Sequence, residues 1–128
     1  MRFAAMLLAL CCSANAQSGK IPVIVDSTGD DTVGSRLAYQ VRGQIAQSAL
    51  FREPKGKELY LKVHLVTLDP DSSIESTRGS RTIYAMSLTI VGPTANDEKY
   101  LTTTVGKCGT SVVARCAESI LSDLVKYK

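Results

Sequence analysis

The spacing of apolar residues changes several times along this chain, and these changes constrain its fold more than any other feature. Ile21 to Val25 is an almost continuous apolar run, which is typical of a strand covered on at least one face. The apolar residues then recur at every fourth position, which predicts a helix with one buried stripe. That stripe consists of Val33, Leu37, Val41, Ile45 and Ala49.

Strict alternation follows in two later segments, Leu59 to Leu68 and Thr82 to Val91, and predicts two half-buried strands joined by the polar hairpin loop Asp69 to Arg81. Lys99 to Val105 is a Thr-rich strand by the same reasoning. After a loop at 106–110, the helical spacing returns. The residues expected inward are Leu59, Leu61, Val63 and Leu65, then Tyr84, Met86, Leu88 and Ile90, and finally Val113, Ala117, Ile120, Leu121 and Leu124.

The order β-α-β-β-β-α predicts an α+β fold with a four-stranded mixed sheet and both helices on one face. The first strand is expected to run parallel to the strand at 59–68 through a right-handed crossover, and the later strands to form antiparallel hairpins. The other face of the sheet is left open.

The first sixteen residues have the pattern of a secretory signal peptide. Arg2 is followed by the apolar run Phe3 to Leu10 and the small-residue stretch Ser13-Ala14-Asn15-Ala16. We expect cleavage before Gln17, a single α/β domain over residues 17–128, and a periplasmic or secreted protein with no stable membrane insertion. A lipoprotein is disfavoured because Leu10 and Cys11, which precede the two leader cysteines, are not the small residues that lipidation requires.

The cysteines outside the leader are Cys108 and Cys116, an even pair in a chain expected to be exported. Their spacing is not C-x-x-C, so it lacks the signature of a redox enzyme or a zinc ribbon. A structural disulfide between them is therefore predicted.

Alternation places several polar side chains on the open face of the sheet. Tyr60, Lys62 and His64 share one face of their strand, and Ser87 and Thr89 point outward from the next. These five residues form the predicted binding surface, and a strand edge such as 99–105 is the alternative site of recognition.

A second group of polar residues, Asp26, Asp30 and Asp31, lies between the first strand and the first helix. Carboxylates there suit either a cation site or helix capping and turn formation. Capping explains the same residues without a ligand, so we predict no metal and no cofactor.

Charge and motifs exclude several functions. The whole chain carries fifteen Lys and Arg against twelve Asp and Glu, and loss of Arg2 with the leader lowers the net charge from +3 to about +2, so nucleic acid is not the expected partner. The one histidine, His64, has no signature nucleophile or orienting acid near it in sequence, and no G-x-S-x-G, H-E-x-x-H or S-x-x-K is present.

The segment from the first strand through Asp26-Ser-Thr-Gly-Asp30 and the first helix to Leu50-Phe51-Arg52 resembles the opening of bacterial envelope proteins of the TolB amino-terminal and curli-assembly lipoprotein type. The resemblance covers about a third of the mature chain. It implies a periplasmic accessory protein that binds other envelope components and catalyses no reaction.

These observations favour an exported, non-enzymatic binding or accessory module of the bacterial periplasm or cell envelope. Its partner is expected to be an envelope or secreted protein recognised through the sheet face or edge. A small secreted hydrolase or hydrolase inhibitor is the alternative, and its candidates are His64 and the carboxylates of Asp26, Asp30 and Asp31.

Overall fold

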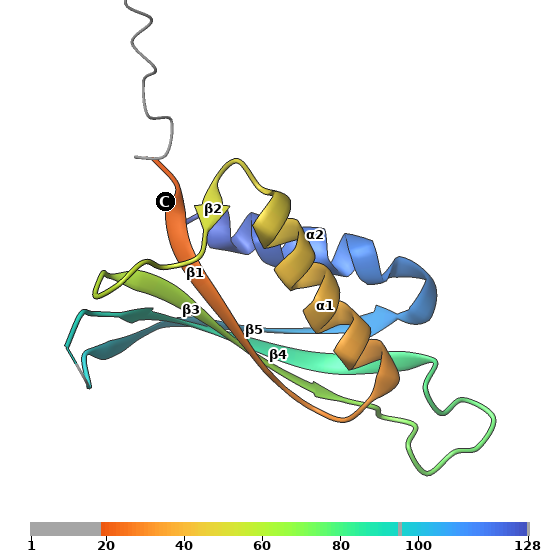
Figure 1. Cartoon of the computed structure of the whole chain (residues 1–128). Coiled ribbons are helices and arrows are strands. Elements are labelled where there is room, and N and C mark those ends of the chain that lie inside the picture. The colour runs from red at the N-terminus through yellow and green to blue at the C-terminus, as the bar shows by residue number, and fades with distance from the viewer. Residues whose placement is uncertain (1–18, 95, 128) are drawn as a thin grey trace, which may run out of the picture.

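A computed structural model describes residues 19–94 and 96–127 of the chain (Figure 1). The expected leader at 1–16 and its cleavage point lie outside these residues. The elements in chain order are β1 (Ile21–Thr28), α1 (Thr32–Gln47), β2 (Phe51–Arg52), β3 (Tyr60–Leu68), β4 (Arg81–Val91), β5 (Glu98–Gly109), a 3-10 turn (Thr110–Val112) and α2 (Val113–Val125).

The strands form one mixed sheet in the order β2-β1-β3-β4-β5. Strand β1 is parallel to β2 and β3, while β3, β4 and β5 are antiparallel to one another. Both helices cover the same side of the sheet, as Figure 1 shows. The predicted α+β fold with a mixed sheet and two helices is therefore confirmed.

The predicted number of strands was wrong, because the sheet has five strands and not four. The additional strand, β2, contains only Phe51 and Arg52, which pair with Ile21 and Pro22. Two residues are too few to show any alternation, so side-chain periodicity cannot detect such a strand.

Two strands are also longer than predicted. Residues 26–28, predicted as a loop, belong to β1 and pair with His64, Leu65 and Val66 of β3. Strand β5 continues through residues predicted as a loop to Gly109. Leu59, predicted inward, precedes β3 and is exposed. Backbone pairing with a neighbouring strand, rather than apolar alternation, sets these limits.

The core lies between the sheet and the two helices. In α1 the predicted stripe is buried except for Ala49, which follows the end of the helix and is exposed. Asp31 is the N-cap of α1, and its Oδ2 accepts a hydrogen bond from the Gly34 amide at 2.8 Å. Gly34 must remain glycine because a Cβ there would overlap the Thr67 side chain of β3.

Cys108 and Cys116 form the predicted disulfide, with their Cα atoms 6.2 Å apart. Cys108 lies near the end of β5 and is buried, while Cys116 lies in α2 and packs against the core. The bridge therefore ties the outermost strand of the sheet to the second helix.

The loop between β3 and β4 is more ordered by hydrogen bonds than its polar sequence predicted. Asp69 and Asp71 are buried, and the Asp69 carboxylate accepts hydrogen bonds from the amides of Asp71 and Gly79, both at 2.8 Å. Arg81 donates to both carboxylate oxygens of Asp71 at 2.8 and 3.0 Å. Only the middle of the loop is solvated as expected.

Candidate functional site

The open face of the sheet has a polar half and an aliphatic half. The alternation of β3 places Lys62 and His64 on this face, because Leu61, Val63 and Leu65 are buried beneath the helices. In the register of the sheet, Lys62 lies opposite Thr89 and His64 lies opposite Ser87. Four of the five residues of the predicted binding surface are thus brought together on two neighbouring strands.

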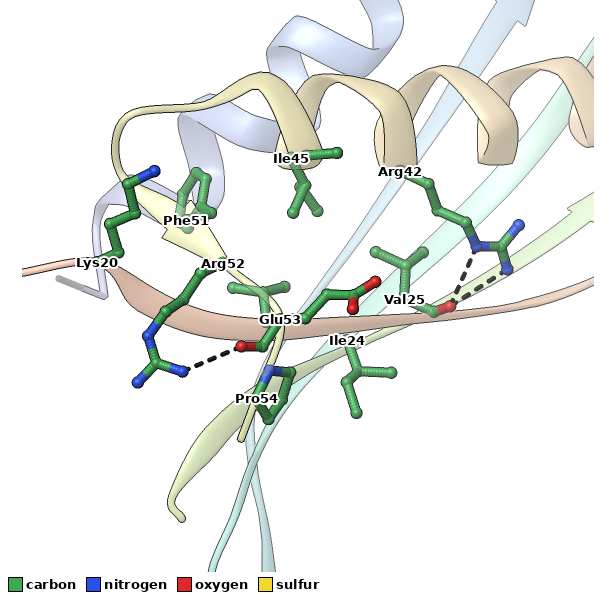
Figure 2. A pocket seen from close by; sticks show the side chains of 11 residues that line it. Lys20, Ile24, Val25, Arg42, Ile45, Phe51, Arg52, Glu53 and Pro54 are labelled. Carbon is green, nitrogen blue, oxygen red and sulfur yellow. Dashed lines mark hydrogen bonds between the residues drawn. The ribbon is translucent and has the colours of Figure 1, made fainter. Parts of the chain in front are cut away.

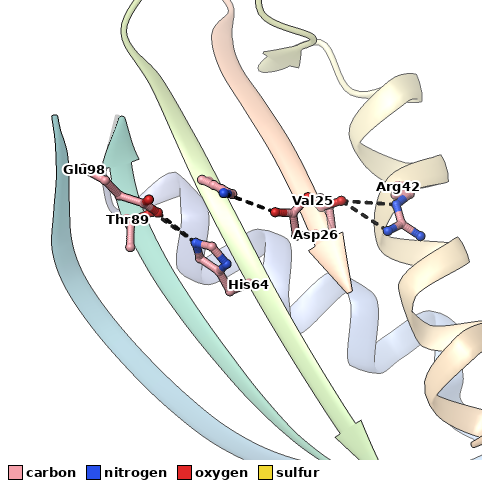
Figure 3. Close-up of polar contacts among 7 residues, drawn as sticks. Val25, Asp26, Arg42, His64, Thr89 and Glu98 are labelled. Carbon is pink, nitrogen blue, oxygen red and sulfur yellow. Dashed lines mark hydrogen bonds and ion pairs between the residues drawn. The ribbon is translucent and has the colours of Figure 1, made fainter. Parts of the chain in front are cut away.

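One pair in the polar half joins β3 to β1 (Figure 3). The Lys62 Nζ lies 3.2 Å from the Asp26 Oδ2. This hydrogen bond with Asp26 is the main reason that the pKa of Lys62 is raised above its ordinary value. Asp26 therefore neutralises a lysine on the open face.

The three carboxylates considered as possible metal ligands have different surroundings. Asp26 pairs with Lys62, Asp31 caps α1, and Asp30 is exposed in the loop between β1 and α1. Over residues 19–94 and 96–127, no three His, Cys, Asp or Glu side chains gather closely enough to hold a metal ion. The geometry gives each of Asp26 and Asp31 a structural role.

A second group links β3, β4 and β5 through Glu98 (Figure 3). The His64 Nε2 lies 2.9 Å from the Glu98 Oε1, and the Thr89 hydroxyl donates to the same oxygen at 2.7 Å. Hydrogen bonds from Thr89 and then from His64 lower the pKa of Glu98 below its ordinary value. Glu98 was not anticipated from the sequence, because it lies at the start of β5, beyond the segment predicted as that strand.

The remaining members of the predicted surface complete the polar half. The Ser87 hydroxyl lies 2.9 Å from the Thr103 hydroxyl of β5, so two adjacent strands share this hydrogen bond. Tyr60 begins β3 and is half-buried. Apart from Tyr60, the polar half therefore consists of side chains that bond partners on neighbouring strands, in separate groups that together span β1, β3, β4 and β5.

The aliphatic half continues along the same strands beyond His64. Strand β3 contributes Val66 and Leu68, β4 contributes Ile83, and β5 contributes Val105. We call these four residues the aliphatic patch. Their side chains remain 52, 64, 42 and 68% exposed, respectively.

The register makes the aliphatic patch continuous. Leu68 lies opposite Ile83, Val66 lies opposite Ala85, and Ala85 in turn lies opposite Val105. Aliphatic side chains at neighbouring positions on three strands form one apolar surface. Large contiguous patches of exposed apolar surface are common at interaction sites.

The sequence contained a signal for this patch that our prediction did not use. The alternation that assigns Tyr60, Lys62 and His64 to the open face also assigns Val66 and Leu68 to it. Continuing the same count past His64 would have predicted an apolar end to that face. The positions of Ile83 and Val105 beside them required the pairing register.

No family model matches this sequence, and no curated protein matches it with significant similarity. Neither α1 nor α2, the two α-helices of the described residues, combines the length and the apolarity that a membrane crossing needs.

Proposed function

We propose that this protein is an exported, non-enzymatic binding module that docks a periplasmic, envelope or secreted protein through the open face of its sheet. The aliphatic patch is the observation that carries the proposal. Its exposed side chains occupy three adjacent strands, and a partner with a complementary apolar face would remove them from water. Such burial is favourable by about 25 cal/mol per Å² of apolar surface.

The polar half supports recognition in a different way. Its ionisable groups already have partners, since Lys62 pairs with Asp26 and the Glu98 carboxylate bonds His64 and Thr89. A partner that lies against paired charges pays a smaller desolvation cost than it would against unpaired ones, and least where these groups stay at the solvated rim of the contact. The polar half then serves as a rim that fixes orientation beside the apolar centre of contact.

Among the described residues Ser87 is not bonded to His64, which argues against a serine–histidine pair for hydrolysis. Ser87, the serine opposite His64 in the register, bonds the Thr103 hydroxyl, and the His64 Nε2 is directed to Glu98. Of the three carboxylates considered for a catalytic role, Asp26 bonds Lys62 and Asp31 bonds the start of α1, while Asp30 is exposed in the loop between β1 and α1.

Export is supported by two independent features. The pattern of residues 1–16 is that of a signal peptide. The disulfide between Cys108 and Cys116 is of the kind that persists in oxidising compartments such as the periplasm and the extracellular space.

A comparison of surface variants tests the proposal. The mature, oxidised protein and its Leu68→Asp/Val105→Asp variant are immobilised, exposed to extract from the native host, and the retained proteins are quantified by mass spectrometry. We expect a stoichiometric protein on the unchanged chain and a loss of at least about tenfold on the variant, because the two carboxylates disrupt the apolar contact.

The control is Tyr39→Asp, which places one new carboxylate on an exposed side chain of α1. Retention of the partner must survive this change. Equal recovery on the Leu68→Asp/Val105→Asp variant would contradict the proposal, as would activity on a hydrolysable substrate that is lost with His64→Ala.

A further inference from the structure

The outer edge of β1 is only partly covered by another strand. The short strand β2 pairs with Ile21 and Pro22 alone, whereas β1 continues to Thr28. Residues 23–28 are paired with β3 on one side. In the described part of the chain, no strand lies against the other side of this stretch.

A groove of about 700 Å³ runs along this edge (Figure 2). Val23, Ile24 and Val25 all line it. Successive side chains of a strand point to opposite faces, so three consecutive residues can line one groove only if it follows the edge of the strand. Ile45 of α1 and Phe51 of β2 add apolar wall.

Arg42 of α1 bonds the free edge of β1 at the place where the backbone of an additional strand would bond (Figure 2). Its Nη2 donates to the Val25 carbonyl at 3.2 Å and to the Ser27 hydroxyl at 2.8 Å. The Val25 carbonyl therefore points outward, and so does the Val25 amide, because both groups of one strand residue face the same side. Unpaired strand edges are commonly covered by charged side chains in this way.

The charges around the groove are predominantly positive. Lys20, Arg42 and Arg52 line it, with Glu53 as the one acid among the lining residues. Arg52 is compensated by Glu58, whose pKa is lowered to about 2 chiefly by hydrogen bonding with Arg52. Arg42 and Lys20 bond only uncharged groups among the described residues. In the described part of the chain, Lys20 and Arg42 are thus two cations of the groove that form no ion pair.

We propose that this groove binds an extended acidic peptide segment, which adds to the outer edge of β1 as a new strand. One of its carboxylates attracts Arg42 away from the Val25 carbonyl, and the peptide backbone takes over that hydrogen bond. Strand addition of this kind obtains affinity from main-chain bonds and specificity from side chains along the edge. This site is distinct from the aliphatic patch, because the groove lies between the edge of β1, α1 and β2, whereas the patch lies on the open face of β3, β4 and β5.

Fluorescence anisotropy with two labelled octapeptides tests the proposal. Both are capped at each end, one alternating glutamate with valine and the other alternating lysine with valine. At low ionic strength we expect the mature protein to bind the glutamate peptide more tightly, by about tenfold. Arg42→Glu should reverse this preference, because it replaces attraction by repulsion without altering the backbone of β1.

Arg36→Glu is the matched control, because Arg36 is an exposed residue of α1 that does not line the groove. It should leave both affinities within about twofold. A Val25→Pro variant removes only the outward amide of β1, so a folded variant should lose affinity for both peptides.

Three results would overturn the proposal. They are the absence of saturable binding, an unchanged preference in Arg42→Glu, and equally tight binding of a glutamate peptide with N-methylated backbone amides. The last result would show that the groove binds the acidic peptide without backbone pairing to β1. None of them affects the test of the aliphatic patch, which uses other variants on other strands.

Discussion

The two halves of the open sheet face are built on the same strands but differ in how their side chains are satisfied. In the polar half, Lys62, His64 and Thr89 each find a partner on a neighbouring strand. In the aliphatic patch, Leu68 and Val105 remain about two-thirds exposed to water. Among the described residues, the side chains of the polar half bond one another across strands, whereas those of the aliphatic patch are exposed to water.

Because of this difference in exposure, the aliphatic patch is the half of the face to test first for binding. Residue type alone pointed to the polar half, because polar side chains are the usual candidates for chemistry. In the structure those side chains link neighbouring strands, and we propose the aliphatic residues of the same face as the binding site.

The largest expected effect separates the two faces of β3. Leu65 is buried beneath the helices, while Leu68 lies in the aliphatic patch. We expect Leu65→Ala to lower the free energy of unfolding by about 3 kcal/mol, because it leaves a cavity. Leu68→Ala should change it by less than about 0.5 kcal/mol, measured by urea denaturation. A similar loss for both variants would show that Leu68 contributes to the core rather than to an uncovered surface.

Removal of the disulfide should have the next largest effect and should act on one half of the face. We expect the Cys108→Ser/Cys116→Ser variant to lose about 2–3 kcal/mol of unfolding free energy. Because Cys108 follows Val105 on β5, amide exchange should accelerate near the aliphatic patch more than near Glu98. Uniform acceleration along β5 would contradict this local anchoring.

A smaller loss is expected in the polar half. Thr89 is buried and donates to Glu98, so Thr89→Val removes one charge-assisted hydrogen bond while keeping the shape of the side chain. The expected cost is about 1 kcal/mol in chemical denaturation. Thr103→Val, which affects a more exposed pair with Ser87, should cost less. The reverse order would mean that Glu98 does not organise the polar half.

The smallest effect concerns pH. The pKa of Glu98 is lowered in the folded protein by its hydrogen bonds with Thr89 and His64. Glu98 therefore contributes stability above its unfolded pKa of about 4.5, and this contribution is lost as the pH falls below that value. Glu98→Gln should flatten the fall of the melting temperature in this acidic range. An identical pH profile in the variant would show that Glu98 does not contribute to the loss of stability in acid.

Side-chain periodicity predicted the parts of this fold that depend on burial. The stripe from Val33 to Ile45 and the inward residues of β3 and β4 follow from sequence because each buried face imposes a fixed period. The disulfide followed from cysteine number and spacing.

Features that depend on pairing between distant segments were not predictable in this way. Strand β2 exists because Phe51 and Arg52 lie beside β1, and residues 26–28 are extended because β3 lies beside them. The contact between His64 and Glu98 joins residues 34 positions apart. No local pattern contains such neighbours, so the composition of the polar half and the continuity of the aliphatic patch required the structure.

Site-specific photocrosslinking in intact cells of the native host tests most directly whether a partner protein docks on the aliphatic patch. A photoreactive residue is placed in turn at Leu68 in the aliphatic patch, at Tyr60 at the start of β3, and at Tyr39 on α1. We expect a discrete protein adduct from Leu68, a weaker one from Tyr60 and none from Tyr39. Adducts of equal yield from Leu68 and Tyr39, or an adduct from Tyr39 alone, would contradict docking on the aliphatic patch.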